Sequence, residues 1–185
     1  VLFRRQRQMC IRDRTTMLQK LNNLKYPTLA VIKGAAFGGG VGLISCCDIA
    51  LASENSIFSL SEVKVGLIPA TISPYVINAI GARNARRLFT SGERFDSNIA
   101  KQINLVHEIA KEEDLEKRIS YFINHFKQNG PQAVIAAKKI VLDIFNKEID
   151  DSVISHTCEV ISALRTSKEG REGVTAFLEK RNPNW

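Results

Sequence analysis

The sequence has few of the residues that build metal centres and disulfide frameworks. It contains four cysteines and three histidines among 185 residues. Cys46 and Cys47 are adjacent, and neither Cys10 nor Cys158 stands at a metal-ligand spacing from them. The histidines are isolated, and no His-Glu-x-x-His pattern occurs. We therefore expect no metal site, and we interpret the cysteines as small buried thiols in a reducing cytosol.

Long apolar runs are also missing. The uncharged stretch around the glycines, residues 34–47, is too short and too rich in glycine to span a bilayer. The N-terminus does not pair a basic segment with an apolar core, which is the pattern of a secretion signal. These two absences predict a cytoplasmic protein that does not enter a membrane.

The net charge of +7 is concentrated at one end of the chain. Residues 1–14 hold five arginines against one aspartate, a net charge of +4, which leaves +3 for the rest. This segment shows neither helical nor strand periodicity, and its run RQRQMCIRD (5–13) resembles translated sequencing-adapter sequence. We interpret residues 1–14 as a non-native leader. A nucleic-acid-binding arm is the alternative, but it lacks interleaved aromatic residues, so we expect no nucleic-acid partner.

The most informative stretch that is present is residues 33–42, with three consecutive glycines. The β-branched run 28–32 before it predicts a buried strand, and the small apolar residues 41–47 after it predict a helix. Glycines between a strand and a helix let another molecule approach the main chain, where free N–H groups favour an anion or a developing oxyanion. The alternative is a tight strand-to-helix crossing in which the glycines serve packing alone.

The order of patterns predicts an α/β core followed by helices. A short helix begins at Thr15 or Thr16 and ends before Pro27, and strands follow at 28–32, 48–52, 57–60 and 105–109. Helices are predicted at 73–80, 84–90 and 96–103 between the last two strands. From residue 111 the pattern is helical, with segments at 114–128, 131–145, 151–164 and one ending at Lys180. We therefore expect a partial core at 15–110 and a helical region at 111–185.

Glu62 is the candidate catalytic side chain. The chain has no Gly-x-Ser-x-Gly elbow, no P-loop lysine and no dinucleotide-binding fingerprint, so a side-chain nucleophile and a nucleotide cofactor are not predicted. Glu62 follows a short strand and stands between apolar Leu60 and Val63, where a pocket would suit it to proton transfer. The alternative is a solvated surface glutamate.

Six segments together resemble the crotonase (enoyl-CoA hydratase/isomerase) superfamily over residues 15–185. They are PTLAVIKGAAFGGG (27–40), CDIA (47–50), FSLSE (58–62), GLIP (66–69), SGERFDS (91–97) and EGVTAFLEKR (172–181). The longer runs GAAFGGGVGLISCCD (34–48) and LIPATISPY (67–75) resemble bacterial methylglutaconyl-CoA hydratases. The resemblance implies the ClpP/crotonase ββα spiral core, here partial, and a C-terminal helical trimerisation region.

The resemblance also implies roles for individual residues. Gly39 matches an oxyanion-hole donor, Glu62 matches the second of two catalytic glutamates, and the first glutamate falls on Gly42. Further positions match the binding surface for substrate and coenzyme A, with the last two of them reaching the nucleotide bound by a neighbouring subunit: Ala36, Phe37, Gly38, Pro69, Phe177 and Lys180.

The implied activity is hydration of an α,β-unsaturated acyl-CoA, with 3-methylglutaconyl-CoA of leucine degradation as the substrate and no separate cofactor. Arg83, Arg86 and Arg87 are candidate partners for the free carboxylate of that substrate, and surface placement is the alternative. A Δ3-Δ2 enoyl-CoA isomerase and a non-catalytic acyl-CoA-binding fragment are the alternative functions. The family's first oxyanion donor would precede residue 15, so we expect the chain alone to be inactive and the full protein to be a homotrimer or a dimer of trimers.

Overall fold

A computed structural model of the chain describes the backbone of residues 2–185 and the side chains of residues 9 and 11–185. The chain divides into two compact units. The first comprises residues 2–24 and 28–118, and the second comprises residues 25–27 and 119–185. The boundaries predicted at residues 14 and 110 stay predictions. The structural division between the units lies after residue 118, inside a helix that begins at Leu115.

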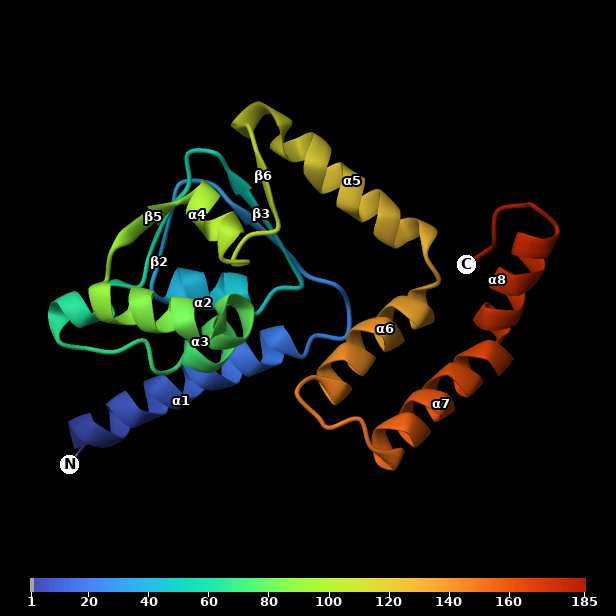
Figure 1. Ribbon diagram of the computed structural model, residues 1–185, viewed down its shortest axis with the longest axis horizontal. Helices are drawn as coiled ribbons and strands as arrows, with labels where there is room; N and C mark the ends of the chain where they lie inside the picture. The colour runs from blue at the N-terminus through green and yellow to red at the C-terminus, as the bar shows by residue number, and fades with distance from the viewer. Residues whose placement is uncertain (1) are drawn as a thin grey trace. The chain divides into compact units, whose positions relative to one another are not determined.

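Two three-stranded sheets form the frame of the first unit (Figure 1). One sheet has the order β1-β3-β6, from β1 (Leu29–Ile32), β3 (Ile49–Ser53) and β6 (Glu108–Ala110), and all its strands are parallel. The other has the order β2-β4-β5, from β2 (Ala35–Phe37), β4 (Ile57–Ser59) and β5 (Arg94–Asp96). In this sheet β2 and β4 are parallel, whereas β4 and β5 are antiparallel. The predicted α/β class is therefore confirmed.

Gly34 carries the chain from the first sheet to the second. Its φ of 81° lies in the left-handed region, which costs glycine little and other residues more. The turn separates β1 from β2, so the glycine-containing stretch holds a strand that the sequence pattern did not predict. β5 was also missed. Both strands are three residues long, too short to show an alternating pattern.

The core of the first unit lies between the sheets and three helices. Fully buried Val41, Phe58 and Val76 come from α2 (Gly39–Ser45), β4 and α3 (Ser73–Ser91). The Phe58 ring stacks on Phe95 of β5 with 5.6 Å between ring centres. In Figure 1 the helices α1, α2 and α3 lie beneath the strands. This packing fixes the start of α2, the end of β4 and the segment before α3 as one block.

Breaks and caps in the helices follow the sequence closely. α3 is interrupted at Gly81, whose φ of 76° and ψ of 156° are not helical, so two short helices are joined there as predicted. Asp96 caps α4 (Ser97–Gln102) by accepting a hydrogen bond from the Ile99 amide, 2.9 Å from its carboxylate. Two 3₁₀ turns complete this unit, at Ser61–Val65 and Glu112–Asp114.

The first helix begins earlier than predicted. α1 runs from Leu2 to Asn22 without interruption, whereas the pattern placed its start at Thr15 or Thr16. Neither threonine caps a helix. Their hydroxyls donate instead to the carbonyls of Ile11 and Arg12, one turn back along the same helix. That residues 1–14 are a non-native leader stays a prediction.

The second unit consists mostly of helices. After α5 (Leu115–Gln128), whose first turn belongs to the first unit, come α6 (Pro131–Ile144), α7 (Asp151–Thr166) and α8 (Lys168–Leu178). Asp150 caps α7 and Ser167 caps α8. Glu169 of α8 accepts hydrogen bonds from the amides of Gln132 and Ala133, which satisfies the start of α6. In the part of the chain that the structure describes, no helix combines the length and the apolar character needed to cross a bilayer.

Candidate active site

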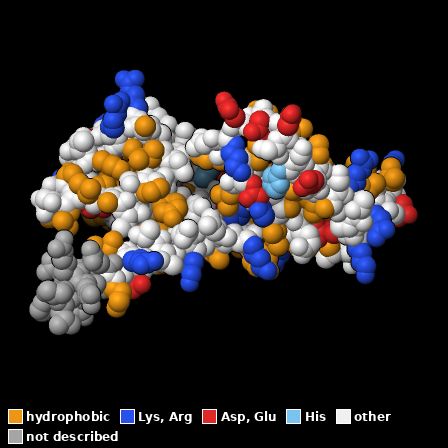
Figure 2. All heavy atoms as spheres, turned by 90° about the horizontal axis from the view of Figure 1, so that it is seen from below, with side chains coloured by type: hydrophobic (Ala, Val, Ile, Leu, Met, Phe, Trp, Pro, Cys, Tyr) orange, Lys and Arg blue, Asp and Glu red, His pale blue; other side chains and the backbone are white. Residues whose placement is uncertain are grey.

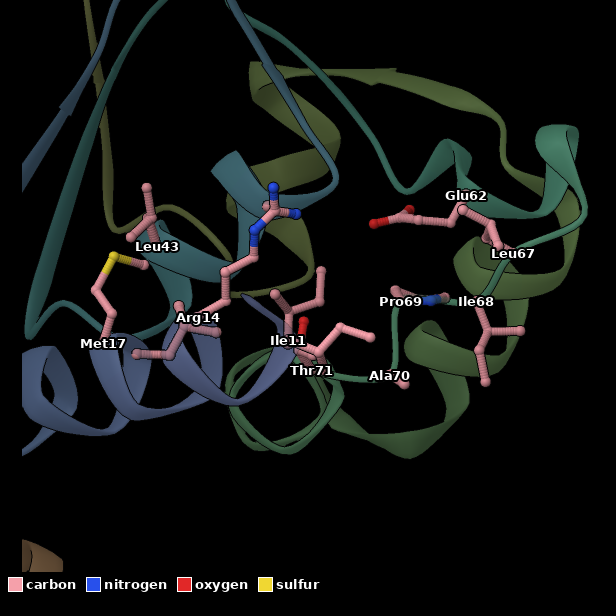
Figure 3. A pocket seen from close by; sticks show the side chains of 13 residues that line it. Ile11, Arg14, Met17, Leu43, Glu62, Leu67, Ile68, Pro69, Ala70 and Thr71 are labelled. Carbon is pink, nitrogen blue, oxygen red and sulfur yellow. The ribbon is translucent and has the colours of Figure 1, made fainter. Parts of the chain in front are cut away.

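A cavity of about 610 Å³ lies in the first unit (Figure 3). Its walls come from three regions of the chain: α1, the start of α2, and the segment from Glu62 to the beginning of α3. The residues that line it are mostly apolar: Ile11, Arg14, Met17, Leu18, Gly39, Leu43, Glu62, Leu67, Ile68, Pro69, Ala70, Thr71 and Ile72. Among these, Glu62 is the single carboxylate and Arg14 the single cation. Figure 3 shows both side chains directed into the cavity from different walls.

Glu62 is held by the tight turn that follows β4. It lies in the 3₁₀ turn Ser61–Val65, and its carbonyl accepts a hydrogen bond from the Leu67 amide at 3.0 Å. Gly66 closes the turn in the left-handed conformation, with a φ of 72°. Within the described residues, the Oε2 atom of Glu62 is buried and has no hydrogen-bond partner. A buried carboxylate oxygen without a partner is unusual in a folded protein and is free to accept a proton from a ligand.

Gly38 lies directly against this carboxylate. A Cβ atom at position 38 would stand 2.7 Å from Oε1 of Glu62, closer than a real Cβ atom approaches an oxygen. The φ of Gly38 is 47°, which also disfavours a side chain. Its amide donates to the carbonyl of Ser59 at 2.9 Å, so the glycine loop is tied to the strand that leads to Glu62. Glycine at this position lets the loop and the carboxylate share one site.

Gly39 presents its backbone to the cavity beside Glu62. It is the first residue of α2, where an amide has no carbonyl one turn earlier in the helix to bond to. A Cβ atom at Gly39 would meet nothing within 4 Å, so the cavity is open on the Cα side of this residue. The N–H group of a residue that begins a helix and lines the same cavity as a carboxylate could hold a carbonyl oxygen that gains negative charge.

Gly42 is a glycine for a different reason. A Cβ atom there would stand 2.2 Å from Cγ2 and 2.7 Å from Cβ of Ile72, which lines the cavity. Gly42 is the position that the resemblance assigns to the first glutamate of the hydratases. The structure leaves no room for any side chain there, and an apolar wall stands where a second carboxylate would be.

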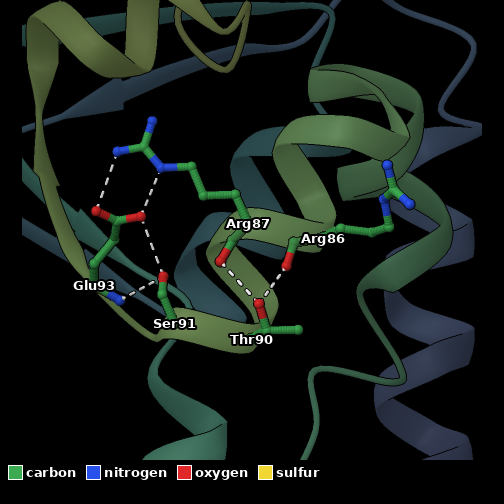
Figure 4. Close-up of polar contacts among 5 residues, drawn as sticks. All are labelled: Arg86, Arg87, Thr90, Ser91 and Glu93. Atoms are coloured by element: carbon green, nitrogen blue, oxygen red, sulfur yellow. Dashed lines mark hydrogen bonds and ion pairs between the residues drawn. The ribbon is translucent and has the colours of Figure 1, made fainter.

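The three candidate arginines for a substrate carboxylate do not line the cavity. Arg83, Arg86 and Arg87 are exposed on α3. Arg87 forms a two-pronged ion pair with Glu93, at 2.7 and 3.1 Å, and Ser91 donates to the same carboxylate (Figure 4). These hydrogen bonds, the one from Arg87 first, lower the pKa of Glu93. Surface placement, the alternative interpretation, is what the structure shows.

The other predicted binding residues are divided between the two units. Pro69 lines the cavity with Gly39 and Glu62. Ala36 and Phe37 of β2 directly precede Gly38 in the sequence but do not line the cavity. The Arg94 guanidinium lies 5.5 Å from the centre of the Phe37 ring. Phe177 and Lys180 belong to the second unit and are exposed, with Phe177 at 82%.

Sequence reasoning missed most of the apolar wall. Leu43 could have been found, because it follows Gly39 by four residues and therefore shares a face of the same helix. The run 67–72 carries no comparable signal, since loop residues show no periodicity that separates cavity from surface.

Charged side chains elsewhere are spread over the surface of the part of the chain that the structure describes (Figure 2). Figure 2 shows lysines and arginines distributed over the visible surface, with hydrophobic side chains exposed between them. Among the side chains that the structure describes, no group of three or more His, Cys, Asp or Glu residues could hold a metal ion.

Comparison with known proteins gives consistent matches. The profile of a protein family described as enoyl-CoA hydratase/isomerase matches residues 3–185. The chain is 33% identical over 161 residues to the enoyl-CoA hydratase ACTT6 of Alternaria alternata, which covers 85% of this chain and 53% of that protein. It is also 33% identical over 175 residues to the mitochondrial Delta(3,5)-Delta(2,4)-dienoyl-CoA isomerase of Dictyostelium discoideum, covering 94% of this chain and 59% of that protein.

Solved structures agree with these matches. The crystal structure of an enoyl-CoA hydratase from Shewanella pealeana has a TM-score of 0.93 at 41% identity, with 98% of this chain and 68% of that chain covered. Pseudomonas aeruginosa AtuE has a TM-score of 0.89 at 30% identity, with 93% and 67% covered. The chain spans between about half and three-fifths of the length of the curated relatives that it matches.

Proposed function

Because the chain belongs to the enoyl-CoA hydratase/isomerase family, we propose that a longer protein containing residues 15–185 adds water across the double bond of an α,β-unsaturated acyl-CoA thioester. The observation that carries this proposal is the buried, unpartnered Oε2 of Glu62 in a cavity that Gly39 also lines. A general base and a main-chain donor are the two groups that such a hydration requires.

The proposed reaction uses Glu62 for both proton transfers. The Gly39 N–H binds the thioester oxygen, so that electron density can move onto that oxygen when water attacks C3. Glu62 accepts a proton from the attacking water, and the C3–O bond forms as the C2–C3 double bond becomes an enolate. The same carboxylic acid then returns a proton to C2, which restores the thioester carbonyl and completes the addition of one water.

A single carboxylate is enough for this scheme because the proton that Glu62 accepts from water is the proton that it returns to C2. The packing of Ile72 on Gly42 leaves the described cavity without a second carboxylate. Glu62 therefore has to alternate between base and acid within one turnover.

The finer proposal is that the acyl group is 3-methylglutaconyl and that the reaction belongs to leucine degradation. It depends on the resemblance of residues 34–48 and 67–75 to methylglutaconyl-CoA hydratases. Arg14 is the cation that faces the cavity, and it lies in the segment predicted to be a leader, so a native partner for the distal carboxylate would come from residues outside 15–185.

A Δ3-Δ2 double-bond isomerase is the second candidate, and one comparison supports it in part. The Dictyostelium relative is named as a dienoyl-CoA isomerase, and an isomerase also needs one base beside an oxyanion donor. A panel of 2-enoyl, 3-enoyl and 3-methylglutaconyl thioesters given to the full-length protein separates these functions. Formation of 3-hydroxyacyl-CoA supports hydration, and conversion of 3-enoyl into 2-enoyl thioesters alone supports isomerisation. Binding without either product supports an acyl-CoA-binding role.

The proposed assembly is a homotrimer or a dimer of trimers in the cytoplasm, formed through the terminal helices. Large apolar side chains on α8, Val174, Phe177 and Leu178, are between 55% and 82% exposed, which suits a surface that another subunit covers. Native mass spectrometry of the full-length protein tests this, and a monomer at micromolar concentration would contradict it.

A further inference from the structure

Ile72 is a buried apolar residue of the cavity wall that packs against the backbone of α2. It is 3% exposed and precedes α3, where its carbonyl accepts hydrogen bonds from the amides of Tyr75 and Val76 at 3.1 and 3.0 Å. Its side chain rests on Gly42 of α2, a backbone position with no Cβ atom. A branched side chain held between two helices has little freedom to move aside for a ligand.

Ile72 packs on α2 at Gly42, and this place on the helix determines which part of a bound substrate would contact it. Gly42 follows Gly39 by three residues, about 4.5 Å further along the helix axis. A thioester oxygen bound at the Gly39 amide, with its reacting carbons at Glu62, would direct the rest of the acyl chain either along this helix or out of the cavity. Along the helix it would pass Gly42, on which Ile72 packs, and Leu43 and Thr71 also line the cavity. Ile72 is the most buried of these three side chains and cannot recede, because Gly42 lies behind it.

We propose that Ile72 is a specificity-determining residue of this site, which limits the length of the acyl chain beyond the double bond. Glycine at position 42 leaves the space that the Ile72 side chain occupies. This inference rests on the proposed acyl-CoA function and adds a restriction on the substrate class. The substrates are thioesters with short or compact acyl groups, and a long straight chain is excluded by the Ile72 side chain.

The direct test replaces Ile72 by alanine in the full-length protein. The ratio of kcat/KM for a ten-carbon to a four-carbon 2-enoyl-CoA should rise about tenfold or more, since a single methylene in a hydrophobic pocket changes discrimination by about 10-fold to 200-fold. Ile80→Ala is the matched control. Ile80 is equally buried in α3, at 4% exposure, but does not line the cavity, so its loss should leave the ratio unchanged.

A second variant covers the case in which Ile72→Ala does not fold. Ile72→Val removes only one methyl group and should raise the same ratio by a smaller factor. The seating of Ile72 is tested separately by melting temperatures. Gly42→Ala should lower the melting temperature, and combining it with Ile72→Ala should recover part of that loss, because the added methyl then meets a void.

The outcomes distinguish this inference from the proposed function. If the ratio for Ile72→Ala equals that for Ile80→Ala, Ile72 does not set chain length and the inference is wrong. If the wild-type protein turns over no thioester, the proposed function fails, and the same ratio is then measured as affinities for decanoyl-CoA and butyryl-CoA by calorimetry. If neither thioester binds to the wild-type protein, both conclusions are overturned.

Discussion

Gly38 combines a left-handed backbone with a side-chain neighbour at contact distance, and the two constraints can be separated by experiment. Gly38→Ala would add the cost of a positive φ and would also push a methyl group against Oε1 of Glu62. Gly34→Ala is the matched control, because Gly34 has a φ of 81° but no atom within 4 Å of the place that an alanine methyl group would take. Each change should cost about 1 kcal/mol or somewhat more in unfolding free energy from the backbone alone.

The two alanine variants should differ in activity. In the full-length protein Gly38→Ala should lower kcat by about 10²-fold, because the Glu62 carboxylate must move away from the reacting carbons. Gly34→Ala should retain most of the wild-type turnover. Equal losses of activity in the two variants would mean that the contact between Gly38 and Glu62 does not position the base. Denaturant unfolding curves measured beside the rate assays separate the stability effect from the catalytic one.

Glu62 itself carries the second prediction at this scale. Glu62→Gln keeps the size of the side chain but removes its ability to transfer protons, so kcat in the full-length protein should fall by about 10²–10⁴. A melting temperature close to that of the wild type should accompany the loss, since Oε2 has no hydrogen-bond partner to lose. Near-normal turnover by Glu62→Gln would show that another group is the base.

A glutamate introduced at Gly42 offers a control on the one-carboxylate scheme. Gly42→Glu should not rescue Glu62→Gln, because Ile72 already occupies the space that the new side chain would enter. The double variant should instead melt below Glu62→Gln. Recovery of turnover would show that Ile72 can move aside and that the wall opposite Glu62 is not fixed.

How far the sequence predicted these residues depends on the range of the contacts. Gly39 and Glu62 were proposed from motif positions, and the structure places both on one cavity. The reason for Gly42 could not be predicted, because Ile72 is thirty residues away and comes from a loop whose path no local pattern specifies. The triple glycine predicted that something approaches the backbone closely. Only the folded structure shows that Glu62 and Ile72 are two of the groups that approach it.

At the scale of elements, the end of the chain is fastened to α8 by a charged cluster. Arg181 donates to Glu172 at 2.6 and 3.0 Å and to Glu179 at 2.6 Å, and the Asn184 amide donates to Glu172 at 2.8 Å. The hydrogen bonds from Arg181, and then the one from Asn184, lower the pKa of Glu172 to about 2. Because the folded pKa lies below the unfolded value of 4.5, this cluster stabilises the fold fully above pH 4.5 and loses that effect as the pH falls towards 2.

Glu172→Gln tests this pH dependence. The variant should melt below the wild type at pH 7, and the difference should shrink between pH 4.5 and pH 2 as the wild-type carboxylate becomes protonated. The effect should be modest, since the side chain is 27% exposed and solvent screens the pair. Glu179→Gln is the control, because Glu179 shares Arg181 but is 57% exposed. A constant difference across this pH range would contradict the assigned cause.

Long elements were predictable from sequence, and short ones were not. The helices α5 to α8 follow Asp, Pro and Ser signals at their first residues and agree with the predicted segments within a few residues. β2 and β5 were missed, because three-residue strands are defined by their partners in the sheet, not by their own pattern. The predicted start of α1 at Thr15 or Thr16 was wrong because each hydroxyl bonds within the helix instead of capping it.

At the scale of the whole molecule, binding and chemistry are expected to depend on different parts of the chain. Lys180→Ala in the full-length protein should raise KM for acyl-CoA more than it lowers kcat, if Lys180 contacts the coenzyme far from the reacting carbons. Lys168→Ala is the control, since Lys168 is exposed at the opposite end of the same helix. An unchanged KM in Lys180→Ala would support the simpler interpretation of an exposed helix-end lysine.

The last prediction concerns residues 1–185 as a separate molecule. The relatives it matches are longer, and the resemblance places their first oxyanion donor before residue 15, so Gly39 alone would have to stabilise the enolate. Loss of one such donor typically lowers kcat by about 10²–10³. We therefore expect the isolated chain to hydrate 2-enoyl-CoA thioesters at least about a hundredfold more slowly than the full-length protein. This should hold even when circular dichroism shows that the isolated chain is folded. Its Glu62→Gln variant gives the background rate. A folded chain that exceeds this background and approaches full-length turnover would show that one main-chain donor and one carboxylate are enough for the chemistry.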